Sequence, residues 1–195
     1  MQTRTVTRTF VLVALMLNLG VAGVYAQSGH PINVRVKMTF SGNGAPSPIN
    51  LNQPDTSTSE ENVAGDGTLG PFTFRNVSAL AKTPQPSSTC AGLFFSRVAG
   101  AGVFRFQDGS LLTVNLTQGS DCIDLVQMVA HCTLTFQISG GTGRFEGASG
   151  VLTWTEAARP VLADAFNTPV FFIETGQLTG TVSGMAEEEE RDDRQ

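Results

Sequence analysis

Residues 139–155, SGGTGRFEGASGVLTWT, decide how this chain is interpreted. Five glycines fall within eleven positions, Gly140 to Gly150, between two segments that alternate apolar and polar residues. Glycine lets the backbone adopt positive φ and approach a neighbouring strand without an intervening Cβ. We therefore predict a strand corner, in which a strand over residues 133–139 enters, the chain kinks at Gly140-Gly141, and Phe145 returns to the core.

Alternation of apolar and polar residues continues through most of the chain. From Ile32 to Phe40 every second residue is apolar, which is typical of a strand with one buried face. Asp108-Gly109 predicts a tight hairpin. Further strands are expected at residues 72–77, 93–98, 103–107, 111–117, 133–139, 151–155, 169–175 and 177–183. About eight strands without a helical period predict an all-β fold, either a small closed antiparallel β-barrel or a β-sandwich. The glycine corner favours the barrel, with the β-sandwich as the alternative.

Residues 41–66 interrupt this alternation. The segment contains several glycines and prolines and the polar run Thr-Ser-Thr-Ser-Glu-Glu at residues 56–61. Such a composition predicts a long loop, either a disordered excursion or a flap over the mouth of a barrel.

The first 26 residues predict a secretory signal peptide. Arg4 and Arg8 precede an apolar run that ends at Val24, and Val24-Tyr25-Ala26 offers small residues where a signal peptidase cleaves. An uncleaved membrane anchor is the alternative, although the run is shorter than the roughly 20 apolar residues of a spanning helix. We expect a secreted or periplasmic protein with a signal peptide over 1–26, one barrel domain over 27–186, an acidic disordered tail over 187–195 and no membrane span after cleavage.

Charge argues against nucleic acid as a partner. The formal net charge is −5, and removal of the signal peptide, which carries Arg4 and Arg8, leaves about −7. Binding to phosphate backbones needs clustered Lys and Arg, which this balance disfavours. The run of acids at residues 187–195 is expected to be solvated and disordered, with a cation-attracting or partner-docking role as the alternative.

Three cysteines and an exported chain make a disulfide plausible. Cys122 and Cys132 flank a short segment that one bridge could close, so we expect this pair. An odd number of cysteines leaves Cys90 paired with either of them as the alternative.

The glycine-rich segment also resembles a known family. Residues 140–150, GGTGRFEGASG, are similar to the Gly-Gly-Ser/Thr-Gly-x-Phe-x-Gly-x-x-Gly segment of the allene oxide cyclase barrel superfamily, which includes dirigent proteins and uncharacterised secreted bacterial proteins. The resemblance implies an eight-stranded antiparallel barrel with an apolar cavity, often assembled as dimers or trimers. It transfers no functional residue, because no positions here match the polar cavity residues of the cyclases or the acidic residues of the dirigent proteins.

No catalytic or metal signature stands out. His30 and His131 are the only histidines, no cysteine pair has zinc spacing, and we expect no metal and no cofactor. Residues 147–150 lack a nucleophile elbow, and residues 140–143 lack the Lys of a phosphate-binding loop.

Four residues are candidates for binding a ligand: Arg144, Glu146, Trp154 and Glu174. Arg144 and Glu146 flank Phe145, so they would line the cavity if Phe145 pointed outward, and otherwise form a surface pair. Trp154 shares a face with Leu152. Glu174 shares a face with Phe172, where a carboxyl on an apolar barrel wall would have a raised pKa, whereas a strand-end position in water would leave it ordinary.

These observations favour a secreted barrel that binds a small apolar ligand or serves as an interaction module. An isomerase or cyclase acting on a lipid-like or phenolic substrate is one alternative, favoured by an inward-facing polar cluster. A structural envelope protein is another, favoured by a cavity filled with Phe side chains. Bulky residues on both faces of 171–173 indicate that a loop or another subunit covers the outer face, and of the two we expect a homo-oligomer.

Overall fold

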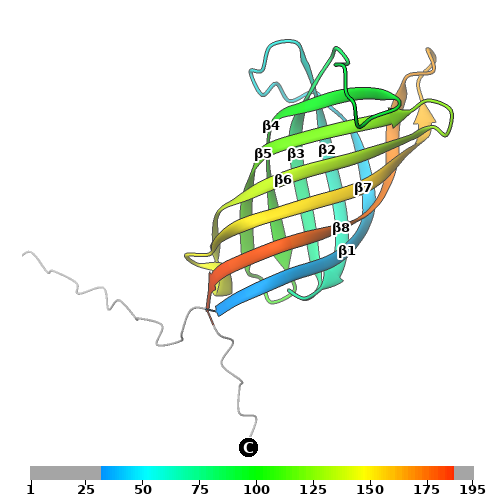
Figure 1. The fold of residues 1–195 in the computed structure, drawn as a ribbon. Coiled ribbons are helices and arrows are strands. Elements are labelled where there is room, and N and C mark those ends of the chain that lie inside the picture. The colour runs from blue at the N-terminus through cyan, green and yellow to red at the C-terminus, as the bar shows by residue number, and fades with distance from the viewer. Residues whose placement is uncertain (1–31, 187–195) are drawn as a thin grey trace, which may run out of the picture.

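The computed structural model describes residues 32–186, which form one closed antiparallel barrel of eight strands (Figure 1). Each strand pairs with the next, and the last pairs with the first. The strands are β1 (Ile32–Ser47), β2 (Thr56–Gly67), β3 (Phe72–Ala81), β4 (Leu93–Phe106), β5 (Leu111–Asp124), β6 (Val129–Thr142), β7 (Ser149–Ala163) and β8 (Pro169–Met185). The predicted barrel is confirmed. The expected signal peptide and acidic tail lie outside the described residues. Within residues 32–186 no helix is long and apolar enough to cross a bilayer.

One half of the barrel interior is filled by apolar side chains. It is the end where β1 begins and β8 finishes, at the bottom of Figure 1. Phe74 stacks on Phe104 with ring centroids 4.0 Å apart, and Phe40 stacks on Trp154 at 3.6 Å. Aromatic pairs of this kind contribute about 0.5–1.5 kcal/mol beyond their buried area.

The long loop expected at residues 41–66 is not present. β1 continues to Ser47, β2 begins at Thr56, and the two strands pair from Met38–Gly67 to Ser47–Thr58, so the connection spans only residues 48–55. The prediction failed because the inward face of β2 is partly polar, which removes the alternation of apolar residues by which a strand is identified.

The glycine-rich segment does form the corner between β6 and β7, but β6 continues through Gly140-Gly141 to Thr142, and the chain turns only at a short 3-10 turn, Gly143–Phe145. Gly143 has φ of 62°, and a Cβ there would crowd the hydroxyl of Ser110. Phe145 is completely buried. The corner therefore closes the apolar end of the barrel.

Two bulges decide which side chains of β4 and β5 face inward. The pairing of β4 with β3 skips Val98, and the pairing of β5 with β6 skips Thr117. A bulge shifts the alternation of faces by one residue. Phe104 therefore faces inward on one side of the first bulge and Arg97 on the other. The second bulge turns Asp121 inward in the same way.

The expected Cys122–Cys132 disulfide is wrong. Cys122 is bonded to Cys90, with Cα atoms 5.6 Å apart, and Cys132 is a buried free cysteine. Cys132 pairs across the ladder with Asp121 and therefore shares its inward face, whereas Cys122 is the next residue along and points the other way. The two cysteines lie on opposite faces of the sheet, which sequence separation alone does not reveal.

Candidate functional site

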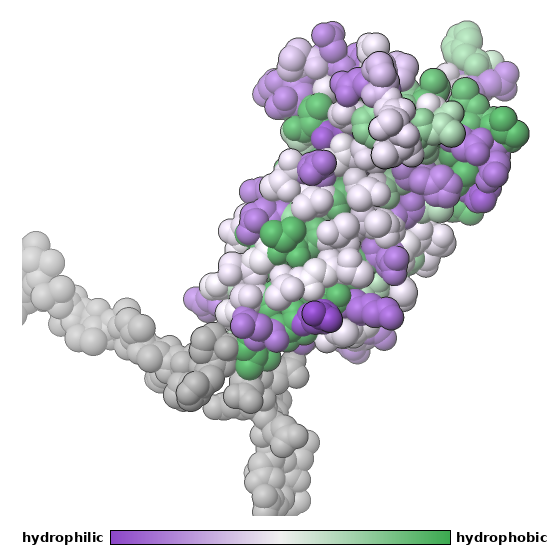
Figure 2. Space-filling view, in the orientation of Figure 1, coloured by the Kyte–Doolittle hydropathy of each residue, from purple (hydrophilic) through white to green (hydrophobic). Residues whose placement is uncertain are grey.

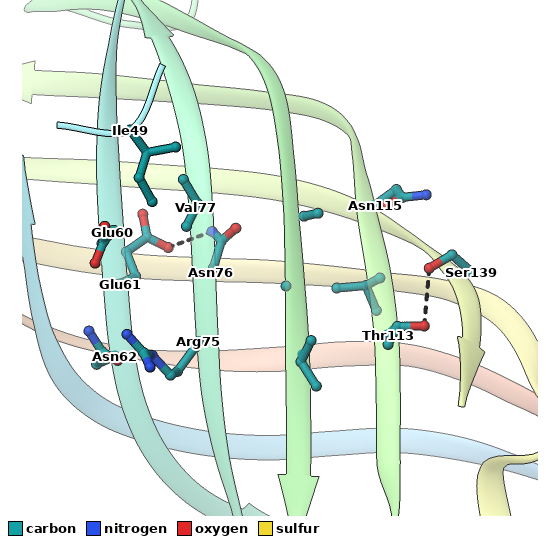
Figure 3. A pocket seen from close by; sticks show the side chains of 14 residues that line it. Ile49, Glu60, Glu61, Asn62, Arg75, Asn76, Val77, Thr113, Asn115 and Ser139 are labelled. Carbon is teal, nitrogen blue, oxygen red and sulfur yellow. Dashed lines mark hydrogen bonds between the residues drawn. The ribbon is translucent and has the colours of Figure 1, made fainter. Parts of the chain in front are cut away.

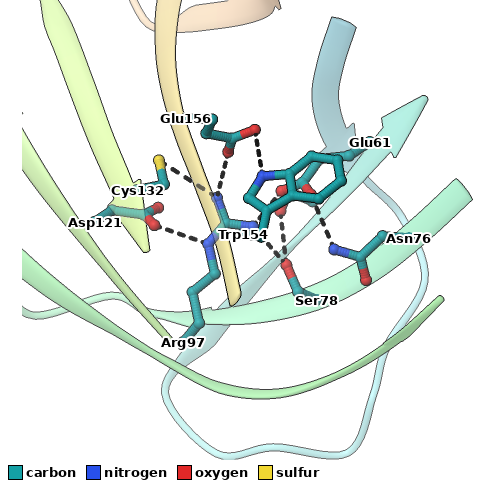
Figure 4. Close-up of polar contacts among 9 residues, drawn as sticks. Glu61, Asn76, Ser78, Arg97, Asp121, Cys132, Trp154 and Glu156 are labelled. Carbon is teal, nitrogen blue, oxygen red and sulfur yellow. Dashed lines mark hydrogen bonds and ion pairs between the residues drawn. The ribbon is translucent and has the colours of Figure 1, made fainter. Parts of the chain in front are cut away.

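The other half of the barrel interior is polar. Seven strands, β2 to β8, contribute inward side chains that are each at most 9% exposed, and we call this set the polar ring (Figure 4). Its members are Glu61, Asn76, Ser78, Arg97, Asp121, Cys132, Glu156 and Glu174. Four carboxyl groups thus share a barrel interior with one guanidinium group.

Arg97 contacts several other members of the polar ring. Its Nε donates to Asp121 Oδ1 at 2.8 Å, and its Nη1 donates to Ser78 Oγ at 2.8 Å and to the carboxylate of Glu61. Nη2 lies 4.0 Å from Glu156 Oε1. Burial alone would lower the pKa of Arg97, but the charges of Glu61 and Asp121 raise it well above its usual range. The guanidinium therefore stays charged and links four strands.

Glu156 is held by the indole of the neighbouring Trp154. The indole Nε1 donates to Glu156 Oε2 at 2.8 Å, whereas Oε1 has no hydrogen-bond partner among the described residues. Burial, followed by the charge of Glu61, raises the pKa of Glu156 to about 8. The group is therefore mostly protonated at neutral pH.

Glu174 lies on the adjacent strand β8. Its Oε2 is buried and has no hydrogen-bond partner within residues 32–186. Burial, followed by the charge of Glu156, raises the pKa of Glu174 to about 9. Gly44 on β1 makes room for it, because a Cβ at position 44 would collide with Glu174 Oε1. At this level of the barrel β1 therefore has a glycine, whereas the other strands carry polar side chains.

Above the polar ring, toward the end of the barrel that carries the 48–55 and 82–92 connections, the inward side chains become apolar again. Leu80, Phe95, Ile123 and Phe172 lie on the inward face of their strands and are half-buried, and we call them the apolar collar. Apolar side chains therefore lie above the polar ring at this end of the barrel.

Exposed apolar side chains surround part of the same end. Val126 in the β5–β6 turn is 94% exposed and Phe166 in the β7–β8 turn is 88% exposed. Figure 2 shows apolar surface at the upper right, over the ends of β7 and β8. We call the exposed apolar residues of these two hairpins the apolar rim: Leu125, Val126, Met128, Val161, Leu162, Phe166, Phe171 and Ile173.

Two of the four predicted ligand-binding residues lie together, and two do not. Trp154 and Glu174 are both buried inside the barrel, at or beside the polar ring. Arg144 lies at the opposite, apolar end, where its Nε is 3.1 Å from Asp108 Oδ2 and its guanidinium stacks over Phe106 and Phe145. Glu146 is exposed in the same turn. The buried Phe145 places both charges outside the ring.

Sequence reasoning missed Glu61, Arg97, Asp121 and Glu156. Glu156 continues the even-numbered face of Leu152 and Trp154, so simple alternation could have identified it. Glu61 lay in the segment taken for a loop. Arg97 and Asp121 face inward because of bulges that the local sequence does not predict.

A separate hollow of about 520 Å³ lies on the outer surface of β2 to β6 (Figure 3). Its lining includes outward side chains such as Arg75, Val103 and Asn115, with Ile49 above them. Glu61 and Asn76 of the polar ring are also among its lining residues, whereas Glu156 and Glu174 are not.

No model of a known protein family matches the chain, and no curated protein matches it. Two solved structures are similar in shape, the pterocarpan synthase dirigent proteins PsPTS1 and GePTS1. PsPTS1 is 13% identical with a TM-score of 0.44, and the match covers 80% of this chain and 97% of that one. GePTS1 is 12% identical with a TM-score of 0.44, and the match covers 84% of this chain and 91% of that one. At these values the function of those proteins is not transferred to this chain.

Proposed function

We propose that this protein is an extracytoplasmic small-molecule-binding barrel that holds a largely apolar molecule in the apolar collar and its polar group on the polar ring. The observation that carries this proposal is the ring of buried carboxyl groups around Arg97, in which Glu156 Oε1 and Glu174 Oε2 have no hydrogen-bond partner within residues 32–186.

Burial of these groups is costly, and the apolar core does not require them. An unsatisfied buried polar group costs about 1–3 kcal/mol, and groups with strongly perturbed pKa values gather at functional sites. The interior of the opposite half of the barrel is packed with apolar side chains. A polar group of a ligand that donates to Glu156 Oε1 or Glu174 Oε2 would satisfy the oxygens that the fold leaves unpaired.

The Cys90–Cys122 disulfide supports a location outside the cytoplasm, where such bonds persist. The apolar rim supports a homo-oligomer, because exposed apolar side chains that lie close together often mark an interface.

Native mass spectrometry of the secreted protein, purified without detergent, tests the proposal. A molecule bound at stoichiometric amount, and identified after denaturing extraction, is the expected result. The same spectrum gives the oligomeric mass. An empty protein of defined mass would contradict the proposal and favour a structural or interaction role.

Two variants test whether the ligand binds at the polar ring. Glu156→Gln keeps an acceptor for the Trp154 indole but replaces the unpaired acidic oxygen, so we expect at least tenfold less bound molecule. Glu60→Gln is the matched control, because Glu60 lies next to Glu61 but faces the other way, where it accepts a hydrogen bond from Ser47. Equal occupancy in both variants would place the ligand elsewhere.

An isomerase or cyclase is the second candidate, and one observation favours it. The polar ring holds two carboxyl groups that are protonated near neutral pH, beside a fixed guanidinium, which is a set able to transfer a proton to a bound substrate. Incubation of any co-purifying molecule with wild-type protein, followed by chromatography, would show conversion to an isomer of the same mass. Wild-type conversion no faster than that by Glu156→Gln would exclude this candidate.

A further inference from the structure

We propose that Glu61, Glu156 and Glu174 form a binding site for one hard divalent cation, with Ca²⁺ as the best match. The three residues lie on β2, β7 and β8, and all are buried. The proposal goes beyond the function proposed above and does not depend on an organic ligand.

The spacing of the three carboxylates fits a single ion. One oxygen from each residue lies within 4.8 Å of the others. Ca²⁺ binds oxygens at about 2.3–2.6 Å, so two oxygens on one ion are at most about 5 Å apart. The three groups therefore need little movement to reach a common centre.

Two buried carboxyl oxygens without hydrogen-bond partners within residues 32–186 indicate that this three-residue cluster binds a further ligand. Glu156 Oε1 and Glu174 Oε2 are buried without a hydrogen-bond partner among the described residues. Gly44 adds an independent observation, because its missing side chain leaves the space that Glu174 Oε1 occupies. An ion would satisfy both oxygens at once.

Supporting hydrogen bonds hold two of the ligands in place. Asn76 Nδ2 donates to Glu61 Oε2 at 2.9 Å, and Trp154 Nε1 donates to Glu156 Oε2 at 2.8 Å. Such outer contacts orient metal-binding carboxylates and commonly change affinity 10–100-fold when removed. The second oxygen of Glu61 accepts from Arg97, and the second oxygen of Glu156 has no hydrogen-bond partner among the described residues.

Charge and ligand type select the class of ion. The ligands are all carboxylate oxygens, which suit hard cations, whereas Zn²⁺ and Cu²⁺ favour nitrogen and sulfur. Mg²⁺ usually keeps several waters, which a buried set does not favour. With Ca²⁺ bound, the four carboxylates of the polar ring would face three positive charges, including that of Arg97.

Tryptophan-sensitised Tb³⁺ luminescence of the full-length protein tests the site. Trp154 is the only tryptophan in the sequence and contacts Glu156 directly, so an ion in the ring would receive energy from it. We expect saturable emission from chelator-treated protein, and displacement of Tb³⁺ by Ca²⁺ but not by equal Mg²⁺.

Glu174→Gln should weaken binding of Tb³⁺ and Ca²⁺ at least tenfold, because it removes one charged ligand while keeping the side-chain shape. Glu60→Gln, on the outward face of β2, should change it less than twofold. Glu156→Gln gives an independent test if Glu174→Gln fails to fold, which circular dichroism would show. The proposal would be overturned by absence of sensitised emission, or by Tb³⁺ emission that Ca²⁺ does not reduce. It would also be overturned if Glu174→Gln, or Glu156→Gln in its place, bound the ions as tightly as Glu60→Gln does. A missing organic ligand would leave this result unaffected.

Discussion

Replacement of Arg97 by methionine should destabilise the barrel strongly. The substitution removes donors to Glu61, Asp121 and Ser78 and leaves two carboxylates buried without a counter-charge. Removal of one partner from a buried ion pair typically costs about 3–5 kcal/mol. Small domains are stable by only about 5–15 kcal/mol, so Arg97→Met should lose a large share of the free energy of unfolding at neutral pH.

Urea unfolding followed by Trp154 fluorescence measures this loss. Arg75→Met is the control, because Arg75 lies on the outward face of β3, and we expect a change below about 0.5 kcal/mol. A variant that combines Arg97→Met with Glu61→Gln and Asp121→Asn should recover most of the loss, because no ionised carboxylate then remains without its partner. The reasoning would be refuted if Arg97→Met lost less than about 1 kcal/mol at unchanged m-value. It would also be refuted if the triple variant were no more stable than the single one.

The ion-free protein should lose stability as pH rises from about 5 to 9, because the folded pKa values of Glu156 and Glu174, about 8 and 9, lie above their ordinary value of 4.5. Both groups face Glu61, Arg97 and Asp121, and Glu156 also faces Cys132. Urea midpoints that rise over this pH range would contradict the assignment. Removal of the disulfide by Cys90→Ala and Cys122→Ala should cost about 3–4 kcal/mol, since it closes a loop with a sequence separation of 32. In native wild-type protein an alkylating reagent should not modify Cys132, and rapid modification would mean that it is not buried. Arg144→Met should lower stability by about 1–2 kcal/mol through loss of its contacts to Asp108 and two aromatic rings, yet leave Tb³⁺ binding unchanged, because Arg144 lies at the far end of the barrel.

Sequence alternation was enough to predict an all-β fold, and the glycine-rich segment favoured the barrel over a sandwich. Alternation also placed Trp154 and Glu174 among the candidates, because both lie on strands without a bulge at that point. For Arg144 and Glu146 the prediction assumed an extended segment where the chain forms a 3-10 turn, and both residues lie away from the polar ring. An extended backbone would have put the two charges on one face, whereas the turn exposes Glu146 and directs Arg144 over aromatic rings.

Most of the polar ring could not be predicted because its members depend on pairing between distant strands. Arg97 and Asp121 face inward only because bulges at Val98 and Thr117 change the alternation, and a bulge is a property of two strands together. The wrong disulfide has the same origin, since the face of each cysteine follows from the register. β2 was not predicted as a strand because its inward residues are partly polar. A strand that lines a polar interior resembles a loop in composition.

An apolar version of the ring would distinguish a functional role from a structural one. Combined replacement of Glu61, Arg97, Asp121, Glu156 and Glu174 by Leu or Met of similar volume removes every charge together, so that no buried ion is left unpaired. Replacement of buried ion pairs by well-packed apolar groups is often neutral or stabilising by about 1–4 kcal/mol. If the ring serves binding, this variant should be at least as stable as wild type in urea and should lose both Tb³⁺ and the co-purifying molecule. A folded variant that is several kcal/mol less stable would show instead that the charged network holds the upper half of the barrel together. Glu156 Oε1 and Glu174 Oε2 have no hydrogen-bond partner within residues 32–186, which favours the first outcome, because a network that served stability alone would not leave them unsatisfied.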